Sequence, residues 1–340
     1  MSADHPPGLD LDRLRAQLDR ERPGLVTGPL TGRLIEGGRS NLTYAVSDGA
    51  SRWVVRRPPL GHVLATAHDM RREHRVIDAL HPTNVPVPRA VLLCEDEGVL
   101  GAPFYVMEFV EGTPYRTAQQ LAPLGAERTR NAVLSLVDTL VELHAVDPAE
   151  VGLADFGRPE GFLDRQLRRW GKQLDASRNR ELAGIDELHA ALGRELPRSP
   201  APAVVHGDYR LDNVLIGADD RINAILDWEM STLGDPLTDL GLLVMYSRPL
   251  GMPHSPVSTT AEAPGHPSPE ELVQRYAERS GRDVSAVSWY EAFAWFKLAV
   301  ILEGIHYRYT LGQTVGRGFD RIGDLVPVFI DHGLTTLQEG

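Results

Sequence analysis

The sequence has little cysteine, a deficit of basic charge and no long apolar run. Cys94 is the only cysteine in 340 residues, which excludes an intrachain disulfide and a thiolate zinc site. The 35 lysines and arginines are outnumbered by 47 aspartates and glutamates. The resulting formal net charge of −12 argues against a protein that grips nucleic acid by its phosphates. A cationic substrate and plain solubility are both compatible with this charge.

No apolar segment approaches the roughly 18 residues that a membrane-spanning helix needs. The N-terminal residues also lack a basic stretch followed by an apolar one, as an export signal would have. We therefore expect a cytoplasmic protein with neither a nucleic-acid nor a membrane partner. A monomer and a homodimer are both compatible with these features.

The first 110 residues contain mostly short β-prone segments. These segments, separated in several places by glycine-bearing turns, cover residues 30–36, 42–47, 52–58, 89–96 and 103–110. Apolar residues recur at helical spacing over 10–22 and 66–80. The pattern predicts a strand-rich N-lobe over residues 1–110, with an N-terminal helix and a five-stranded sheet that carries one further helix.

After Gly112 the pattern becomes helical. Apolar residues recur at three- and four-residue intervals over 127–146, 162–175, 184–196, 269–281, 288–309 and 322–334. A β-hairpin interrupts this region, with arms at 213–217 and 222–228 around a polar turn. We predict a mainly helical C-lobe over residues 111–340.

A polar constellation surrounds the predicted hairpin. The stretch "HGDYRLDN" contains Asp208 and Asn213, and Asp227 follows in "ILDWE" at the end of the second arm. Because a hairpin brings its two ends together, Asn213 and Asp227 are expected beside Asp208. Phosphoryl transfer needs this set: a carboxylate takes the proton of the acceptor hydroxyl, and an Asn and an Asp hold Mg²⁺.

These stretches resemble the catalytic and metal loops of the aminoglycoside phosphotransferase family, bacterial relatives of protein kinases. The longer runs "GGRSNLTY", "RREHRVIDAL" and "LDWEMSTLGDPLTDLG" are similar to the kinase-like N-terminal domain of some acyl-CoA dehydrogenases. The resemblance covers residues 30 to 245. It implies an α+β, bilobal protein-kinase-like fold, with Mg²⁺ as cofactor and ATP or GTP as co-substrate.

The resemblance also implies roles for individual residues. Asp208 is then the catalytic base, Asn213 and Asp227 are the magnesium ligands, and His206 is a structural residue of the loop. Arg210 stands two residues after the base, where protein kinases have a lysine. There it would stabilise charge on the transferred phosphoryl group.

Nucleotide binding is expected in the N-lobe. Arg56 stands where the kinase strand carries its phosphate-binding lysine, with Glu73 on the following helix as its ion-pair partner. Arg57 faces the other side of the strand by the two-residue period. The segment in place of the glycine-rich loop lacks the G-x-G-x-x-G spacing, and a tight hairpin explains its glycines about as often. The further nucleotide-binding candidates are Gly37, Gly38, Ser40, Asn41, Met107, Glu108 and Val110.

The acceptor is the least determined part. Glu229, Trp295 and Tyr307 are candidate acceptor contacts. A surface salt bridge fits Glu229 equally well, and an aromatic cluster such as the one around Trp295 is more typical of core packing. The expected function is a Mg²⁺-dependent kinase acting on a hydroxyl of a metabolite, for example a hydroxyacyl-CoA. The alternatives are an aminoglycoside or macrolide O-phosphotransferase and a nucleotide-binding pseudokinase scaffold, which the arginine at position 56 keeps open.

Overall fold

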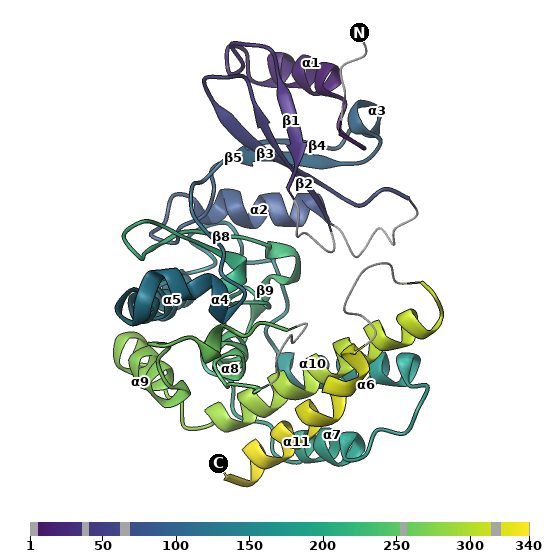
Figure 1. The fold of residues 1–340 in the computed structure, drawn as a ribbon, viewed down its shortest axis with the longest axis vertical. Coiled ribbons are helices and arrows are strands. Elements are labelled where there is room, and N and C mark those ends of the chain that lie inside the picture. Colours follow the sequence, from purple (N-terminus) through teal and green to yellow (C-terminus); the bar gives the residue numbers. More distant parts are fainter. Residues whose placement is uncertain (1–5, 36–40, 62–68, 252–256, 314–320, 340) are drawn as a thin grey trace. The chain divides into compact units, whose positions relative to one another are not determined.

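The computed structural model describes residues 6–35, 41–61, 69–251, 257–313 and 321–339 (Figure 1). The chain divides into two compact units. The first comprises Met1–Gly112 and Asn223–Ser231, and the second comprises Thr113–Ile222 and Thr232–Gly340. The short segment 223–231, which lies within the predicted C-lobe, thus groups with the N-terminal sheet.

The first unit is built on a five-stranded antiparallel sheet. Its strands are β1 (Thr31–Leu34), β2 (Leu42–Ser47), β3 (Arg52–Arg57), β4 (Ala90–Cys94) and β5 (Phe104–Glu108), in the order β1-β2-β3-β5-β4. The predicted five strands are therefore confirmed.

Two predicted helices belong to this unit (Figure 1), α1 (Leu11–Glu21) and α2 (Met70–Leu80). Helix α1 begins at Asp10, whose side chain accepts hydrogen bonds from two main-chain N–H groups of the first turn. Its leucines pack in one core cluster with Trp53 and Val55 of β3. A short helix that the sequence pattern did not indicate, α3 (Glu97–Leu100), joins β4 to β5.

Strand β3 sends its two consecutive arginines to opposite faces of the sheet, as the two-residue period predicts. Arg57 donates hydrogen bonds to the carbonyl groups of Gly8 (2.9 Å) and Leu100 (2.6 Å) and is buried there. Arg56 points to the other face, where it meets Glu73 of α2. The strand therefore separates a structural arginine from one that lies among carboxylates.

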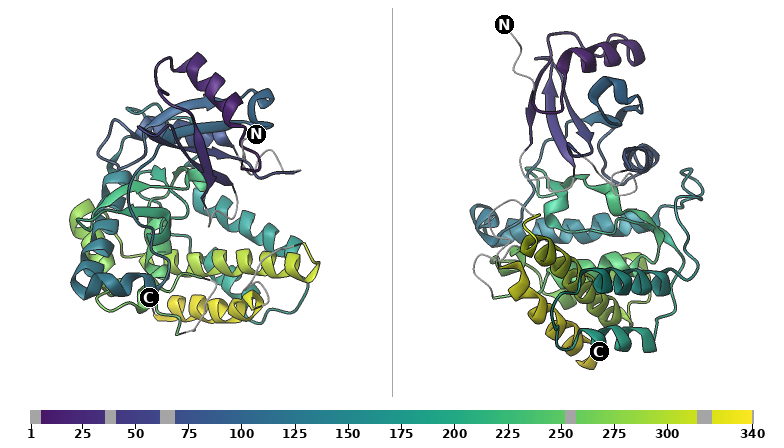
Figure 2. Two further views of the ribbon diagram at one scale, coloured as in Figure 1. Left: turned by 45° about the horizontal axis from the view of Figure 1, so that its top comes forward. Right: turned by 90° about the vertical axis from the view of Figure 1, so that its right-hand side faces the viewer.

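The second unit is mainly helical. It contains α4 (Ala118–Leu121), α5 (Gly125–Ala145), α6 (Phe162–Ser177), α7 (Ile185–Arg194), α8 (Leu237–Tyr246), α9 (Pro269–Ser280), α10 (Val287–Thr310) and α11 (Ile322–Glu339). Helix α10 packs against α6, α7, α8 and α11, and Figure 2 shows it running beside α11. Because α10 has neighbours on several sides, most of its side chains are buried. None of the described helices is long and apolar enough to cross a membrane.

Short strands in this unit position the polar motif. Strand β6 (Ala203–Val205) pairs antiparallel with β9 (Thr232–Gly234) and ends where "HGDYRLDN" begins. Strands β7 (Val214–Ile216) and β8 (Ile222–Ile225) follow as the predicted hairpin, and β8 leads into the segment 223–231 that groups with the first unit. The N–H of Gly217 donates to the carbonyl of Arg221 (2.8 Å) and closes its turn.

Candidate active site

Buried hydrogen bonds hold the loop that follows β6. The carboxylate of Asp239 in α8 accepts the main-chain N–H groups of His206 (2.7 Å) and Gly207 (2.8 Å). The buried His206 ring accepts the N–H of Asp208 (3.2 Å), so this histidine makes the hydrogen bond within the loop that was expected. Gly207 has a φ of 85°, a left-handed conformation that favours glycine. The main chain leading to Asp208 is therefore held in one conformation.

The two carboxylate oxygens of Asp208 differ in their hydrogen bonds to the described residues. Its Oδ2 accepts hydrogen bonds from Asn213 Nδ2 (2.8 Å) and Arg210 Nε (3.2 Å). Its Oδ1 accepts no hydrogen bond from the described part of the chain. Burial raises the pKa of Asp208, but the positive charges of Arg210 and Lys297 outweigh burial, and the net pKa lies below its ordinary value. The carboxylate is therefore ionised at neutral pH, with one oxygen left for a donor.

Arg210 is held between two carboxylates. Its Nη1 donates to Asp212 Oδ2 (2.7 Å), its Nε donates to Asp208, and its guanidinium lies 5.3 Å from the ring centre of Tyr246. The other oxygen of Asp212 is buried without a hydrogen-bond partner among the described residues, and burial raises the pKa of this group. Asp212, to which the sequence pattern gave no role, thus fixes the arginine.

Lys297 of α10 is a neighbour of this loop that the sequence did not reveal. Its Nζ donates a hydrogen bond to the carbonyl of Gly207 (2.7 Å), directly before Asp208 in the chain. It lies 89 positions after Asp208 within a helix whose apolar pattern indicates core packing. A charged residue in the middle of a buried helix was the one available signal.

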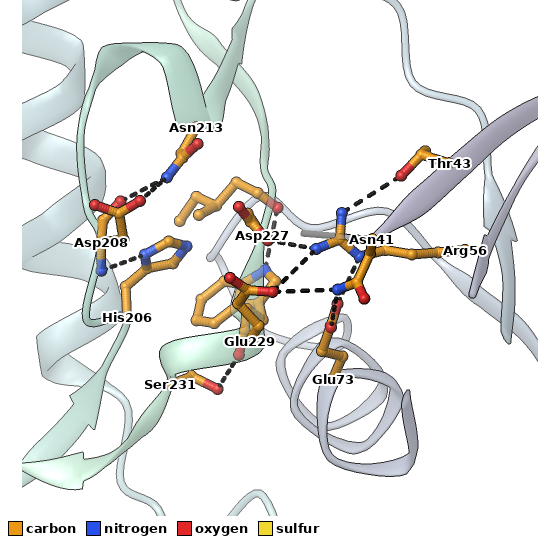
Figure 3. Close-up of polar contacts among 12 residues, drawn as sticks. Asn41, Thr43, Arg56, Glu73, His206, Asp208, Asn213, Asp227, Glu229 and Ser231 are labelled. Carbon is orange, nitrogen blue, oxygen red and sulfur yellow. Dashed lines mark hydrogen bonds and ion pairs between the residues drawn. The ribbon is translucent and has the colours of Figure 1, made fainter. Parts of the chain in front are cut away.

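In the first unit, carboxylates surround the guanidinium of Arg56 (Figure 3). Its Nε forms an ion pair with Glu73 Oε2 (2.8 Å), and its Nη2 bonds Asp227 and lies 3.9 Å from Glu229 Oε2. Nη1 lies 3.5 Å from the hydroxyl of Thr43. The ion pair expected between Arg56 and Glu73 is thus present, while its role in binding nucleotide stays a prediction.

Glu73 is fixed by neutral donors as well. Tyr105 donates its hydroxyl to Glu73 Oε2 (3.0 Å), and Asn41 Nδ2 bridges Glu73 Oε1 and Glu229 Oε2, both at 3.2 Å. Burial raises the pKa of Glu73 to about 7, Arg56 opposes this shift, and Asp227 and Glu229 add to it. Three carboxylates thus face the guanidinium of Arg56.

Each unit offers one side-chain oxygen of the kind that a small, hard cation prefers. Asp227 adopts a left-handed conformation (φ 65°). One of its carboxylate oxygens accepts a hydrogen bond from Arg56, and the other accepts none from the described residues. Asn213 donates through its nitrogen to Asp208, which leaves its amide oxygen as the group for a metal. No group of three or more His, Cys, Asp or Glu side chains in the described segments is placed to hold a metal ion. Mg²⁺ keeps several waters and needs only one or two protein ligands, so these oxygens suit it.

The expected purine contacts are partly engaged within the first unit. The N–H of Glu108 donates to the carbonyl of Arg89 (2.9 Å), so only the Glu108 carbonyl remains for a base. Met107 is buried in β5, and Val110 follows the strand. Gly37, Gly38 and Ser40 lie outside the described residues.

The candidate acceptor contacts belong to different units of the chain. Trp295 is buried, lies 5.1 Å from Phe329 and stacks on His332 at 4.7 Å, an arrangement that favours core packing. Tyr307 is half-buried on the same helix. Glu229 accepts a hydrogen bond from Asn41 in the first unit. It belongs there to the Arg56 cluster, which consists of Asn41, Arg56, Glu73, Asp227 and Glu229. Their contact with an acceptor stays a prediction.

A five-stranded antiparallel sheet followed by a largely helical part defines an α+β, protein-kinase-like protein, which confirms the predicted fold class. The family profile described as "Phosphotransferase enzyme family" (APH) matches residues 31–289, and the chain belongs to this family.

Three relatives illustrate the similarity. "Acyl-CoA dehydrogenase family member 11" of Rattus norvegicus is 37% identical over 314 residues, covering 90% of this chain but only 40% of the relative's length. A crystal structure from Ralstonia eutropha, provisionally assigned as an aminoglycoside phosphotransferase, is 32% identical with a TM-score of 0.83. It covers 97% of this chain and 98% of that one.

The third relative is similar in fold alone. A thermostable mutant of aminoglycoside phosphotransferase APH(4)-Ia, in complex with AMP-PNP and hygromycin B, has a TM-score of 0.62 at 13% identity, over 96% of this chain and 98% of that one.

Proposed function

We propose that the protein is a Mg²⁺-dependent small-molecule kinase that transfers the γ-phosphoryl group of ATP or GTP to a hydroxyl of a metabolite. The observation that carries this proposal is Asp208, an ionised carboxylate whose Oδ2 is tied by Asn213 and Arg210 while Oδ1 remains open. The family to which the chain belongs supports the same reaction class. We propose a cytoplasmic location and a monomer or homodimer.

Asp208 is the proposed catalytic base. The acceptor hydroxyl donates to Oδ1, its oxygen forms the new bond to the γ-phosphorus, and the bond to the leaving nucleoside diphosphate breaks. The hydroxyl proton passes to Asp208. Arg210, fixed by Asp208 and Asp212, presents a permanent positive charge to the transferred group.

The Arg56 cluster is the proposed phosphate and metal site. Arg56, oriented by Glu73, donates to nucleotide phosphates, and Asp227 and Asn213 each offer one oxygen to Mg²⁺, which neutralises phosphate charge when bound. The Glu108 carbonyl and the main chain of Val110 accept and donate at the purine edge. Met107 lies beside them in sequence. Gly37, Gly38, Ser40 and Asn41 are proposed near the phosphates.

For the acceptor we propose a hydroxyacyl-CoA or a related hydroxy metabolite. The proposal is supported by 37% identity to a part of "Acyl-CoA dehydrogenase family member 11" of Rattus norvegicus. Trp295, Tyr307 and Glu229 are retained as proposed acceptor contacts, with Trp295 the least accessible of the three.

A phosphorylation screen tests the proposal. The full chain is incubated with ATP or GTP, with and without Mg²⁺, against hydroxyacyl-CoAs, aminoglycosides, macrolides and amino alcohols, and products are detected by mass. We expect a hydroxyacyl-CoA heavier by one phosphoryl group, only with Mg²⁺. If only an antibiotic were phosphorylated, the acceptor would belong to the alternative class, the aminoglycosides or macrolides, and not to the metabolites. Nucleotide binding without any product would favour the pseudokinase.

A further inference from the structure

Lysine is rare in this chain. Among 35 lysines and arginines only Lys172 and Lys297 are lysines. Lys172 is exposed on α6, whereas Lys297 is half-buried on α10 among residues that are almost all buried. An ammonium is compact and directs three N–H groups, whereas a guanidinium is planar and broad. Position 297, where the chain has a half-buried lysine, is therefore a position at which a compact cation fits.

The ammonium of Lys297 lies against the peptide that precedes Asp208. Its Nζ donates to the carbonyl of Gly207 (2.7 Å), while the N–H of Gly207 donates to Asp239 Oδ1 (2.8 Å). Both main-chain polar groups of this left-handed glycine are thus fixed, one by α10 and one by α8. The direction in which Asp208 leaves the main chain depends on these two contacts.

Several charges face Lys297. The carboxylates of Asp208 and Asp239 attract the ammonium, and Arg169 and Arg210 repel it, while the ring centre of Trp170 is 5.6 Å from Nζ. Burial lowers the pKa of Lys297 most strongly, and the carboxylates oppose this. One of its three N–H groups has a hydrogen-bond partner in the described part of the chain. Burying a charge costs free energy unless the charge is paired. An apolar side chain would therefore be the simpler choice at this position of the helix.

We infer that Lys297 is a positioning residue for phosphoryl transfer: it holds the Gly207 carbonyl so that Asp208 points to the acceptor, and it adds positive charge beside that carboxylate. The inference rests on the proposed function. It places a second cation, distant in sequence, beside Asp208 together with Arg210.

A measurement without turnover tests the coupling. Because the chain has two lysines, ¹⁵N-lysine labelling gives two ε-ammonium signals, and Lys172 is the internal control. We expect Asp208→Asn to shift the Lys297 signal by more than its linewidth and to leave the Lys172 signal in place. An unmoved Lys297 signal would overturn the inference, whatever the acceptor proves to be.

Kinetics test the positioning role. Lys297→Met should lower kcat on the order of 100-fold, because small misplacement of a catalytic group is costly. Nucleotide affinity should change by less than about twofold, since the variant removes no proposed nucleotide contact. Lys297→Arg should recover part of the loss, and Lys172→Met should match the wild type. An unchanged kcat in Lys297→Met, or equal losses of kcat, nucleotide affinity and Tm in the Met and Arg variants, would contradict the role.

Two further controls keep these outcomes separate. If Lys297→Met does not fold, Lys297→Gln is used in its place, because glutamine keeps an N–H donor without the charge. We expect kcat to fall in this variant as well. If the wild type phosphorylates no acceptor in the screen, the proposed function fails, while the ammonium signals still decide whether Lys297 is coupled to Asp208.

Discussion

Arg56 in the sheet unit and Arg210 in the helical unit both lie between carboxylates, but the groups around them differ. Arg56 in the sheet unit faces Glu73, Asp227 and Glu229. Arg210 in the helical unit bridges two aspartates.

The helical unit also brings Lys297 close to Asp208. Carboxylates thus outnumber the guanidinium around Arg56, which we call the surplus cluster. Two aspartates meet Arg210 and Lys297 in the other, which we call the balanced cluster. Surplus negative charge attracts a cation such as Mg²⁺, whereas balanced charge keeps a single carboxylate ionised and oriented. Under the proposed function, the first cluster would bind a metal nucleotide and the second would take up the proton of the acceptor hydroxyl.

The largest expected effect is at the balanced cluster. Asp208→Asn removes the proposed base, and turnover should fall by roughly 10²- to 10⁴-fold, the usual contribution of general base catalysis. Nucleotide affinity should persist, because the phosphate contacts are proposed at Arg56. Steady-state kinetics and nucleotide titration check both results. Asp219→Asn, in the exposed hairpin turn, is the matched control. Normal turnover of Asp208→Asn would show that the base is assigned to the wrong residue.

The next effect concerns the surplus cluster. Arg56→Met leaves Glu73 buried without its cation, which should cost about 3–5 kcal/mol in the free energy of unfolding. Nucleotide affinity should fall by about tenfold or more, as a charge-assisted phosphate contact is lost. The double variant Arg56→Met/Glu73→Gln removes both charges, so it should regain stability but not nucleotide affinity. Unchanged nucleotide affinity in Arg56→Met would disprove the phosphate clamp.

A smaller effect follows from the pKa of Glu73, raised to about 7 in the folded protein by burial. The folded state then binds this proton more tightly than the unfolded state. The stability it contributes is full below the ordinary glutamate pKa and is lost as pH rises through about 7. Glu73→Gln should remove this decline, worth about 3 kcal/mol at most.

Urea unfolding of wild type and Glu73→Gln, at pH values on both sides of 7, measures the difference. Glu111→Gln, which changes an exposed carboxylate of the same unit, is the control and should keep the wild-type slope. Equal slopes in the wild type and in Glu73→Gln would show that Glu73 is already ionised at low pH and that Arg56 outweighs burial.

The smallest effect is expected at Asp212. Asp212→Asn weakens one of the two anchors of Arg210 and leaves Asp208 as the other. A weakened charge-assisted hydrogen bond of about 1 kcal/mol corresponds to a loss of about fivefold in turnover. Single-turnover kinetics measure it. A loss as large as that of Asp208→Asn would mean that Arg210, and not the base, dominates the balanced cluster.

Local patterns made much of this architecture predictable. The five strands follow the two-residue period, and Leu11, Leu14 and Leu18 follow the helical one, because each pattern directly reflects which side of an element is buried. The opposite directions of Arg56 and Arg57 follow from the same period. Within the site, the ion pair of Arg56 with Glu73 and the structural contact of His206 were expected from the resemblance.

Other parts depend on contacts that no local pattern encodes. Lys297 meets Gly207 only because α10 packs beside α6 and α8. Glu229 joins Arg56 because residues 223–231 group with the sheet unit. The engaged N–H of Glu108 depends on a partner before β4. The contact of Asp212 with Arg210 could not be predicted from the sequence, because the side chains of two aspartates four residues apart in a loop have no fixed relative direction.

The most direct test of the proposed function is the fate of a labelled γ-phosphoryl group in a single turnover. Wild type and Asp208→Asn are mixed with Mg²⁺, γ-labelled nucleotide and the hydroxyl-bearing acceptors of the screen. We predict that the label moves to an acceptor hydroxyl in the wild type and stays on the nucleotide in Asp208→Asn, with equal nucleotide binding in both. Tight binding with no transfer by the wild type, or equal transfer by both proteins, would contradict this account.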